Sequence, residues 1–284
     1  MPSTLYIVST PIGNLSDMTL RAIDVLKSVD WIAAEDTRHS AKLLSHYGID
    51  TKCFSLHEHN EDARIEKIIT LLRSGKSVAI ISDAGTPLIS DPGFRVVRAV
   101  QKENFTVVPV PGACALIAAL TASGLPTDRF MFEGFLPAKQ AAVETVCEQL
   151  KNETRTLIFY ESVHRIVKTL FVMKKIFGAD RLITVARELT KTFETIKQDT
   201  LNNTCDWIEK NTEQQKGEFV LVLHGAPNKI EQSDAALGKL LKTLLSELSV
   251  KQSVSLACKI TGESRKRVYA LALTDTDTDT DTDT

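Results

Sequence analysis

The chain has 284 residues, of which 43% are hydrophobic and 25% charged, and its formal net charge is −2. At roughly 150 residues per domain, this length predicts about two domains. No apolar run reaches the ~18 residues that a transmembrane helix needs, and the N-terminal residues lack the basic segment of a signal peptide. We therefore expect no membrane partner.

The cysteines indicate a reducing environment. There are five, and they are odd in number, far apart in the chain and without a CxxC pair. This spacing favours neither a disulfide framework nor a zinc site, and it fits the cytoplasm. We expect a cytoplasmic protein that binds no metal.

Short apolar segments alternate with amphipathic segments over residues 1–112. Strands are predicted at 5–8, 31–34, 78–81 and 106–110, and helices at about 19–28, 60–75 and 94–102. Asn60 stands where it can cap the second of these helices. Strands alternating with helices predict an α/β domain with a mostly parallel sheet.

A second α/β domain is predicted over residues 113–226. Helices are expected at 113–122, at 138–150 and through residue 170, and strands at 130–133, 156–160, 182–186, 193–197 and 219–223. Closely spaced strands without intervening helices indicate an antiparallel or mixed sheet. The stretch 225–233 is expected to be a linker.

Three loops that follow strands of the first domain combine proline and glycine with small polar residues. They are residues 9–15, 82–93 and 111–113. Ligands bind beyond the carboxyl ends of parallel strands, and glycine lets a ligand approach the backbone closely. The loops therefore predict a rigid, backbone-lined pocket for a molecule the size of adenosine. Neither a P-loop nor a GxGxxG motif occurs, which disfavours kinases, GTPases, Rossmann dehydrogenases and the common Rossmann-like methyltransferases.

Nine ordered segments between residue 5 and about residue 270 resemble one known family. They are LYIVSTPIGNLSD (5–17), AAEDTRHS (33–40), LHEHN (56–60), SDAGTPLISDPG (82–93), PGACA (111–115), LPTDRFMFEGFLPAK (125–139), FYESVHR (159–165), ARELTKTFE (186–194) and KGEFVLVL (216–223). The sequence resembles the tetrapyrrole-methylase superfamily and, within it, the family of bacterial ribosomal RNA small subunit methyltransferases I.

The resemblance implies two α/β domains with S-adenosylmethionine bound in the cleft between them, a small helical C-terminal domain, and a homodimer. It also implies 2′-O-methylation of a cytidine in the decoding region of 16S rRNA, within the small ribosomal subunit. Carried over position by position, it implies cofactor contacts from Pro11, Gly13, Ser82, Asp83, Ala84, Gly85, Thr86, Pro87, Ala113, Cys114 and Tyr160.

Charged residues at three predicted strand ends supply candidates for catalysis. Methyl transfer is an in-line displacement that depends on alignment, and a ribose hydroxyl is a poor nucleophile that a base or a polarising cation would help. The candidate catalytic residues are Glu35, Asp36, Arg38, Glu161 and Arg187, and Arg165 and Lys191 are candidate RNA contacts. Structural ion pairs between the two domains would explain any one of these residues equally well.

Residues 235–273 are expected to form a small helical domain that docks on RNA. This segment has seven basic and two acidic residues, which suits contact with phosphates. A helix, a turn at Gly262 and a second helix capped by Ser264 would give the spacing of a helix-turn-helix. The alternative is a helical pair that only packs on the second domain.

The expected faces of these two helices follow from their apolar spacing. Val254, Ala257 and Ile260 share a face of the first, and Val268 and Leu271 a face of the second. Arg265, Lys266 and Arg267 begin the second helix, where positive charge opposes the helix dipole; we expect them to bind RNA. Residues 274–284 alternate Thr and Asp, depart from the family pattern and are expected to be disordered.

Two other functions remain open. One is a methyltransferase that acts on a tetrapyrrole precursor, although such an enzyme needs no basic C-terminal segment. The other is a non-catalytic ribosome-binding factor, although such a factor needs no cofactor loops.

Overall fold

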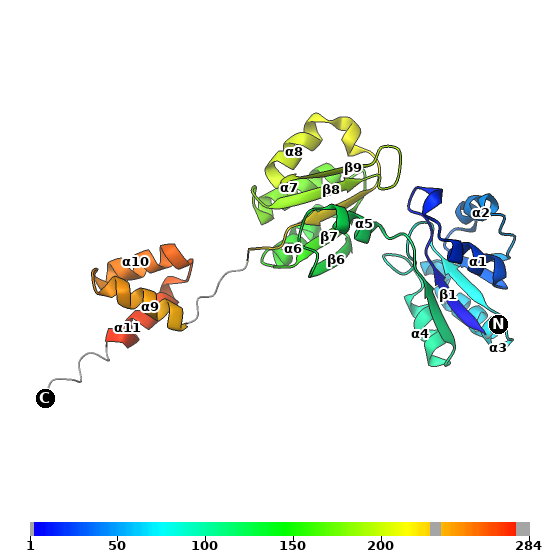
Figure 1. Cartoon of the computed structure of the whole chain (residues 1–284), viewed down its shortest axis with the longest axis horizontal. Coiled ribbons are helices and arrows are strands. Elements are labelled where there is room, and N and C mark those ends of the chain that lie inside the picture. Colours follow the sequence, from blue (N-terminus) through cyan, green and yellow to red (C-terminus); the bar gives the residue numbers. More distant parts are fainter. Residues whose placement is uncertain (1–2, 228–233, 277–284) are drawn as a thin grey trace. The chain divides into compact units, whose positions relative to one another are not determined.

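The computed structural model describes residues 3–227 and 234–276. The chain divides into two compact units, Met1–Ala226 and Pro227–Thr284. The first unit holds two five-stranded sheets with their helices, and the second is helical (Figure 1). No helix in the described ranges is long and apolar enough to cross a membrane.

The first sheet is entirely parallel, which confirms the expected α/β architecture. Its strands are β1 (Thr4–Val8), β2 (Trp31–Ala34), β3 (Cys53–Ser55), β4 (Val78–Ile81) and β5 (Thr106–Val110). Their order is β3-β2-β4-β1-β5. All four residues of β4 are buried, because helices cover both faces of the sheet.

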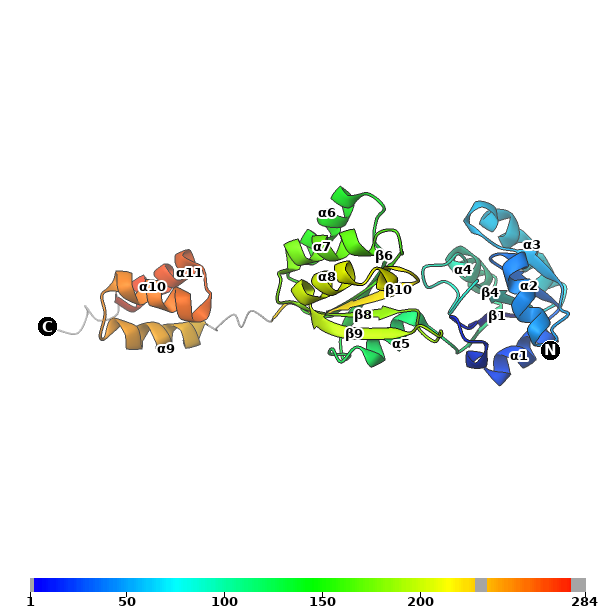
Figure 2. The same cartoon turned by 90° about the horizontal axis from the view of Figure 1, so that it is seen from above.

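Helices lie on both faces of this sheet (Figures 1 and 2). They are α1 (Leu20–Ser28) and α2 (Thr37–His46) on one face, and α3 (Glu61–Arg73) and α4 (Phe94–Lys102) on the other. Each presents an apolar stripe to the strands; Ala22 and Leu26 of α1 are fully buried, as are Val96 and Val100 of α4. Short 3-10 helices, η1 (Leu15–Asp17) and η2 (Glu58–Asn60), occur in the loops.

The expected cap at Asn60 is wrong in its contacts. Asn60 stands at the N-cap position of α3, but its side chain makes no capping hydrogen bond there. Its amide instead accepts from the backbone N–H of His57 and donates to Ser55. The side chain of Asn60 therefore stabilises the preceding 3-10 turn and does not cap the helix.

The second sheet is mixed, as the close spacing of its strands predicts. Its strands are β6 (Phe130–Phe135), β7 (Thr156–Glu161), β8 (Leu182–Arg187), β9 (Thr195–Thr200) and β10 (Phe219–Leu223). The order is β6-β7-β10-β8-β9, with only β6 and β7 parallel. Helices α6 (Gln140–Leu150), α7 (Ile166–Phe177) and α8 (Leu201–Lys210) pack on one face, and α5 (Ala115–Ala122) packs on the other.

Three expectations for this sheet are corrected. Helix α7 continues to Phe177, because Met173, Ile176 and Phe177 extend its buried face. Strand β9 begins at Thr195 rather than Phe193, whose side chain is 71% exposed. A helix, α8, and the 3-10 helix η3 (Thr212–Gln215) lie between β9 and β10, where no helix was expected.

The second unit contains α9 (Asp234–Leu245), α10 (Val250–Thr261) and α11 (Arg265–Thr276). Gly262 ends α10 in the left-handed conformation, with φ 71°, and the Ser264 hydroxyl accepts from the N–H of Arg267 at 3.3 Å, as expected. The buried core consists of Leu237, Leu241, Val254, Ala257, Val268 and Ala272.

Two details of the expected C-terminal region are corrected. Ile260 does not share the buried face of α10, since its side chain is 58% exposed. Helix α11 extends to Thr276, three residues into the Thr-Asp repeat that was expected to be disordered throughout. The remainder of that repeat, residues 277–284, and most of the expected linker, residues 228–233, lie outside the described residues.

Candidate functional site

The three loops rich in proline and glycine meet at the carboxyl edge of the first sheet, because β4, β1 and β5 are neighbours there. Thr10 and Gly85 exchange two backbone hydrogen bonds of 2.8 and 3.1 Å. The Thr86 hydroxyl lies 3.0 Å from the Ser9 hydroxyl and donates to the Ala113 carbonyl at 3.0 Å. Side chains and backbone therefore join all three loops into one surface.

This surface forms one side of a cavity of about 470 Å³, a size typical of small-molecule sites. The second sheet supplies the other side. The lining residues are Ile12, Glu35, Asp83, Ala84, Gly85, Thr86, Ile89, Ser90, Asp91, Cys114, Ala115, Phe135, Tyr160, Glu161, Ser162, Val163, Ala186, Leu189, Gly217, Glu218, Phe219 and Val220.

Six of the expected cofactor contacts line the cavity: Asp83, Ala84, Gly85, Thr86, Cys114 and Tyr160. The other five do not: Pro11, Gly13, Ser82, Pro87 and Ala113. Two of these support the lining, since the Ser82 carbonyl accepts from the Thr10 hydroxyl and the Ala113 carbonyl from Thr86. These two carbonyls therefore hold the lining loops in place from behind.

The charged part of the lining is entirely acidic in the described structure. It contains Glu35, Asp83, Asp91, Glu161 and Glu218, and no lysine, arginine or histidine. Such a lining favours cations and neutral amino groups over phosphates. Among the described residues, no three His, Cys, Asp or Glu side chains are grouped so as to hold a metal ion.

Glu35 follows β2 and Asp83 follows the neighbouring strand β4, and each carboxylate accepts a hydrogen bond from backbone beside the other residue. The Asp83 N–H donates to the Glu35 carboxylate at 3.3 Å, and the Asp36 N–H donates to the Asp83 carboxylate at 3.2 Å. Burial raises the pKa of Glu35, against the lowering effect of the Asp83 N–H, and the nearby carboxylates raise it further. The Glu35 carboxyl is therefore more basic than an ordinary glutamate.

Asp91 completes this acidic cluster. Burial raises its pKa to about 6, helped by the charges of Glu35 and Asp83 and opposed by a hydrogen bond from Ser82. Tyr160 faces Asp91 from the second sheet, and its own pKa is raised by burial first and by the Asp91 charge among lesser causes. Asp91 is therefore, with Glu35, a second lining carboxyl whose pKa lies above its ordinary value.

Asp91 predicts a specific dependence of stability on pH. As pH rises from about 4 to about 6, the unfolded chain ionises Asp91 before the folded chain does, so the folded state loses stability. Asp91→Asn should remove this loss, so it should gain about 1–2 kcal/mol relative to the parent chain over that range; partial solvent screening makes this less than the full shift implies. Urea unfolding at a series of pH values measures the gain. A difference that stays constant with pH would contradict the prediction.

Glu161 lies in the lining, but each of its oxygens is already engaged. Its side chain is fully buried, accepts from the Ser162 N–H at 2.7 Å and from the Thr169 hydroxyl at 2.6 Å, and pairs with Arg165 at 2.9 Å. Arg165 also donates to the Leu136 carbonyl at 2.9 Å. These contacts give Glu161 and Arg165 a structural task at the start of α7.

Asp36 and Arg38 do not line the cavity. Asp36 caps α2 by accepting from the Arg38 N–H at 2.8 Å, and the two side chains form an exposed ion pair at 3.0 Å. The hydrogen bonds from Arg38 lower the pKa of Asp36 to about 2. A carboxylate with so low a pKa is a weak base near neutral pH.

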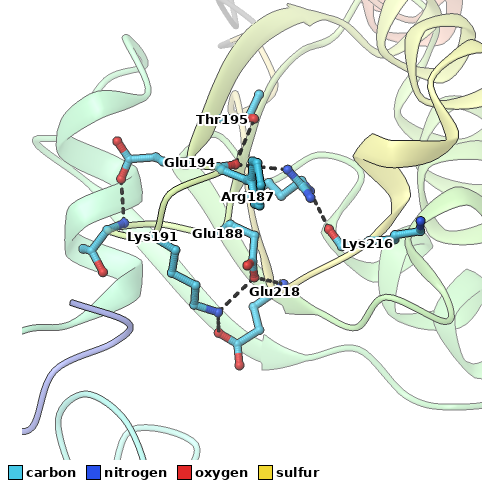
Figure 3. Close-up of polar contacts among 9 residues, drawn as sticks. Arg187, Glu188, Lys191, Glu194, Thr195, Lys216 and Glu218 are labelled. Atoms are coloured by element: carbon cyan, nitrogen blue, oxygen red, sulfur yellow. Dashed lines mark hydrogen bonds and ion pairs between the residues drawn. The ribbon is translucent and has the colours of Figure 1, made fainter. Parts of the chain in front are cut away.

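Arg187 and Lys191 are held by the loop between β8 and β9 and by the segment just before β10 (Figure 3). The buried Arg187 guanidinium donates to the carbonyls of Lys216 and Phe193. Lys191 forms ion pairs with Glu188 at 2.9 Å and with Glu218 at 2.8 Å. Neither residue lines the cavity, and both fix the backbone that forms one of its walls.

The basic residues of the second unit differ in their surroundings. Arg267 pairs with Glu263 at 2.8 Å and with Asp234 at 2.9 Å, so it joins α11 to α9. Arg265 and Lys266 are exposed at the start of α11. The three residues expected to bind RNA thus divide into one packing residue and two exposed cations.

Sequence reasoning did not assign roles to several lining residues, among them Asp91, Phe135 and Glu218. All three stand inside segments that carry the family resemblance, which was the available signal. Their positions in the lining depend on how the two sheets face each other, and no local pattern reports that.

The fold is that of the tetrapyrrole methylases. Residues 4–204 match the family model described as Tetrapyrrole (Corrin/Porphyrin) Methylases, and residues 231–276 match the RsmI C-terminal HTH domain. A crystal structure of diphthine synthase superposes with a TM-score of 0.61 at 15% identity, covering 78% of this chain and 90% of that one. Uroporphyrin-III-C-methyltransferase from Thermus thermophilus gives 0.54 at 18% identity, covering 78% and 94%. These structural likenesses concern the fold alone.

Relatives of much higher identity define the family more narrowly. Ribosomal RNA small subunit methyltransferase I of Pseudomonas aeruginosa is 50% identical over 271 residues, which are 95% of this chain and 96% of that protein. The protein of the same name from Haemophilus influenzae is 49% identical over 268 residues, 93% and 94% of the two chains. The chain belongs to the ribosomal RNA small subunit methyltransferase I family.

Proposed function

We propose that this chain transfers a methyl group from S-adenosylmethionine to ribosomal RNA of the small subunit, at the 2′-hydroxyl of a cytidine in the decoding region of 16S rRNA. The observation that carries the proposal is the acidic cavity, whose first side is formed by the loops 9–15 and 82–93 and by Cys114 and Ala115, which follow the third loop. The names of the relatives at about half identity support the choice of ribosomal RNA as the acceptor.

The cavity fits the proposed donor in size and in charge. S-adenosylmethionine supplies a methyl group on a cationic sulfur, and it also carries a cationic amino group and a neutral adenosine. The backbone of Ala84, Gly85 and Thr86 suits the neutral part, and the carboxylates of Asp83 and Asp91 suit the cationic part. A volume of about 470 Å³ leaves room for such a ligand.

The five candidate catalytic residues divide into one that could accept a proton and four that make structural contacts. Of the five candidate catalytic residues, Glu35 combines a place in the lining with a raised pKa. This supports Glu35 as the group that accepts the proton of the attacking hydroxyl. The contacts of Asp36, Arg38, Glu161 and Arg187 instead support structural roles, at the start of α2, at the start of α7 and in the loop between β8 and β9.

The decisive experiment incubates the full chain with labelled S-adenosylmethionine and with small subunits from cells that lack the protein. Nuclease digestion of the RNA should then yield labelled 2′-O-methylcytidine from the decoding region. Subunits that bind the chain but acquire no label would favour a binding factor. Label transferred only to a tetrapyrrole precursor, offered in a parallel reaction, would favour the small-molecule alternative.

The two exposed cations of α11 carry the proposed RNA contact of the second unit. Arg265→Glu combined with Lys266→Glu should lower methylation of small subunits and weaken its dependence on salt, because fewer counterions are released on binding. The affinity for S-adenosylmethionine should not change. Activity assayed across a salt series tests this, with Lys242→Glu on α9 as a control for added negative charge. Unchanged activity at all salt concentrations would leave α11 only its packing role.

Arg267 should behave differently from its two neighbours. Arg267→Ala removes ion pairs to Glu263 and Asp234 and should mainly destabilise the helical unit. A thermal melt of the variant separates this effect from a loss of RNA contact.

A further inference from the structure

Phe135 is the most exposed large apolar residue of the cavity lining. Its side chain is 57% exposed, whereas Ile89 and Val163, which also line the cavity, are 37% and 36% exposed. Together these three residues give the lining exposed apolar surface, and apolar patches with polar residues around them mark ligand-binding grooves. Neither the contacts of the proposed donor nor the candidate catalytic residues account for it.

A β-bulge places this ring on the cavity side of the second sheet. Phe132 pairs with Ile158, but Gly134 pairs with Phe159 and Phe135 with Tyr160, so Glu133 is an extra residue in β6. In a regular strand, residues 132 and 135 would point to opposite faces. The bulge turns both rings to the face that carries Tyr160.

The two rings pack against Tyr160. Phe132 lies 4.9 Å and Phe135 lies 5.4 Å from the Tyr160 ring, in both cases near edge-to-face. The Tyr160 hydroxyl accepts from the Leu116 N–H at 3.2 Å. One edge of the Phe135 ring is therefore supported, while more than half of its side chain stays open to solvent.

The backbone beside Phe135 is also fixed. The next residue, Leu136, is buried in the core on the opposite face of the sheet, and its carbonyl accepts from Arg165 at 2.9 Å. The ring is thus a rigid platform and needs little ordering when a partner arrives. Preorganised aromatic surfaces of this kind bind at a low entropic cost.

We infer that Phe135 is the platform on which an unpaired RNA base, next to the reacting ribose, stacks at the mouth of the cavity; this rests on the proposed function. Proteins hold splayed-out RNA bases mainly by stacking them on aromatic rings. The charge of the lining selects the base over the phosphate. A lining carboxylate such as Glu218 repels a phosphate but accepts a hydrogen bond from a base that bears an amino group.

The main competing assignment gives the ring to the adenosine of the donor. The two assignments differ in which ligand loses affinity when the ring is removed. Phe135→Ala should raise the KM for small subunits about 10- to 100-fold, as loss of one stacked base does. The affinity for S-adenosylmethionine, measured by calorimetry without RNA, should stay unchanged. Binding of the variant to small subunits, measured by sedimentation, should weaken in parallel with the KM.

Two further variants sharpen the test. Phe135→Trp keeps a stacking surface and should restore the KM. Phe171→Ala is the matched control, since Phe171 is 38% exposed on α7, the helix layer that packs on the other face of the sheet; it should leave the KM unchanged.

The outcomes separate this inference from the proposed function. A fall in donor affinity for Phe135→Ala, or a KM equal to that of the parent chain, would overturn the inference while the parent chain still methylates RNA. An absence of methyl transfer by the parent chain itself would overturn the proposed function instead.

Discussion

Gly85→Val should reduce the affinity for S-adenosylmethionine at least about 100-fold, or roughly 3 kcal/mol, while the chain still folds. Gly85 lines the cavity and pairs through its backbone with Thr10. Its φ is +80°, and a Cβ there would lie 3.2 Å from Cγ2 of Ile12, another lining residue. A branched side chain would therefore both strain the loop and push into the space that the donor needs. Calorimetric titration of the purified variant measures the loss.

Gly75→Val provides the matched control. Gly75 has nearly the same φ, +82°, but a Cβ there would have no atom within 4 Å. It lies in the turn between α3 and β4, at the end of the sheet opposite the loops. Both variants should lose about 1–3 kcal/mol of stability from backbone strain, and only the change at position 85 should affect the donor. A folded Gly85→Val chain with normal donor affinity would refute this cofactor site.

Glu161→Ala should cost about 3 kcal/mol of folding stability, since it leaves the Arg165 guanidinium without its buried partner. It also leaves the Thr169 hydroxyl, which is buried on α7, without its acceptor. Thr169→Val removes only that one hydrogen bond and should cost about 1 kcal/mol. Chemical denaturation of the three chains gives both differences.

The same variant separates structure from catalysis at position 161. Methyl transfer by Glu161→Ala, normalised to the folded fraction, should remain close to that of the parent chain. Full stability together with lost transfer would instead make Glu161 a catalytic residue.

The strands at 31–34, 78–81, 106–110 and 219–223 could be located from the sequence to the residue. Three of them are continuous apolar runs, and the fourth, 106–110, is apolar after its first residue, so local composition marks them. Helix α2 was not predicted because its apolar residues are few, Ala41, Leu43 and Leu44, and of these only Leu44 is buried. Strand β3 has three residues, too few to show a period.

The sequence predicts those parts of the candidate site that are formed by loops. It does not predict those that depend on contacts between residues far apart in the chain. The glycines and prolines of residues 82–93 mark this loop in the sequence, and its residues line the cavity. The charged residues carry no such local signal. Arg187 donates to a carbonyl 29 residues away, and Lys191 pairs with a glutamate 27 residues away. The place of Phe135 in the lining could not be predicted, because it depends on the bulge in β6.

The Lys191 side chain lies so close to Gly13 that the residue types allowed at these two distant positions depend on each other. A Cβ at position 13 would lie 2.5 Å from Cγ of Lys191. A side chain gained at position 13 would therefore require the Lys191 side chain to move or to be shortened, and either change weakens the ion pairs to Glu188 and Glu218. The two positions should therefore tend to change together. In an alignment of relatives, glycine at 13 and a long side chain at 191 should co-occur more often than their separate frequencies would give.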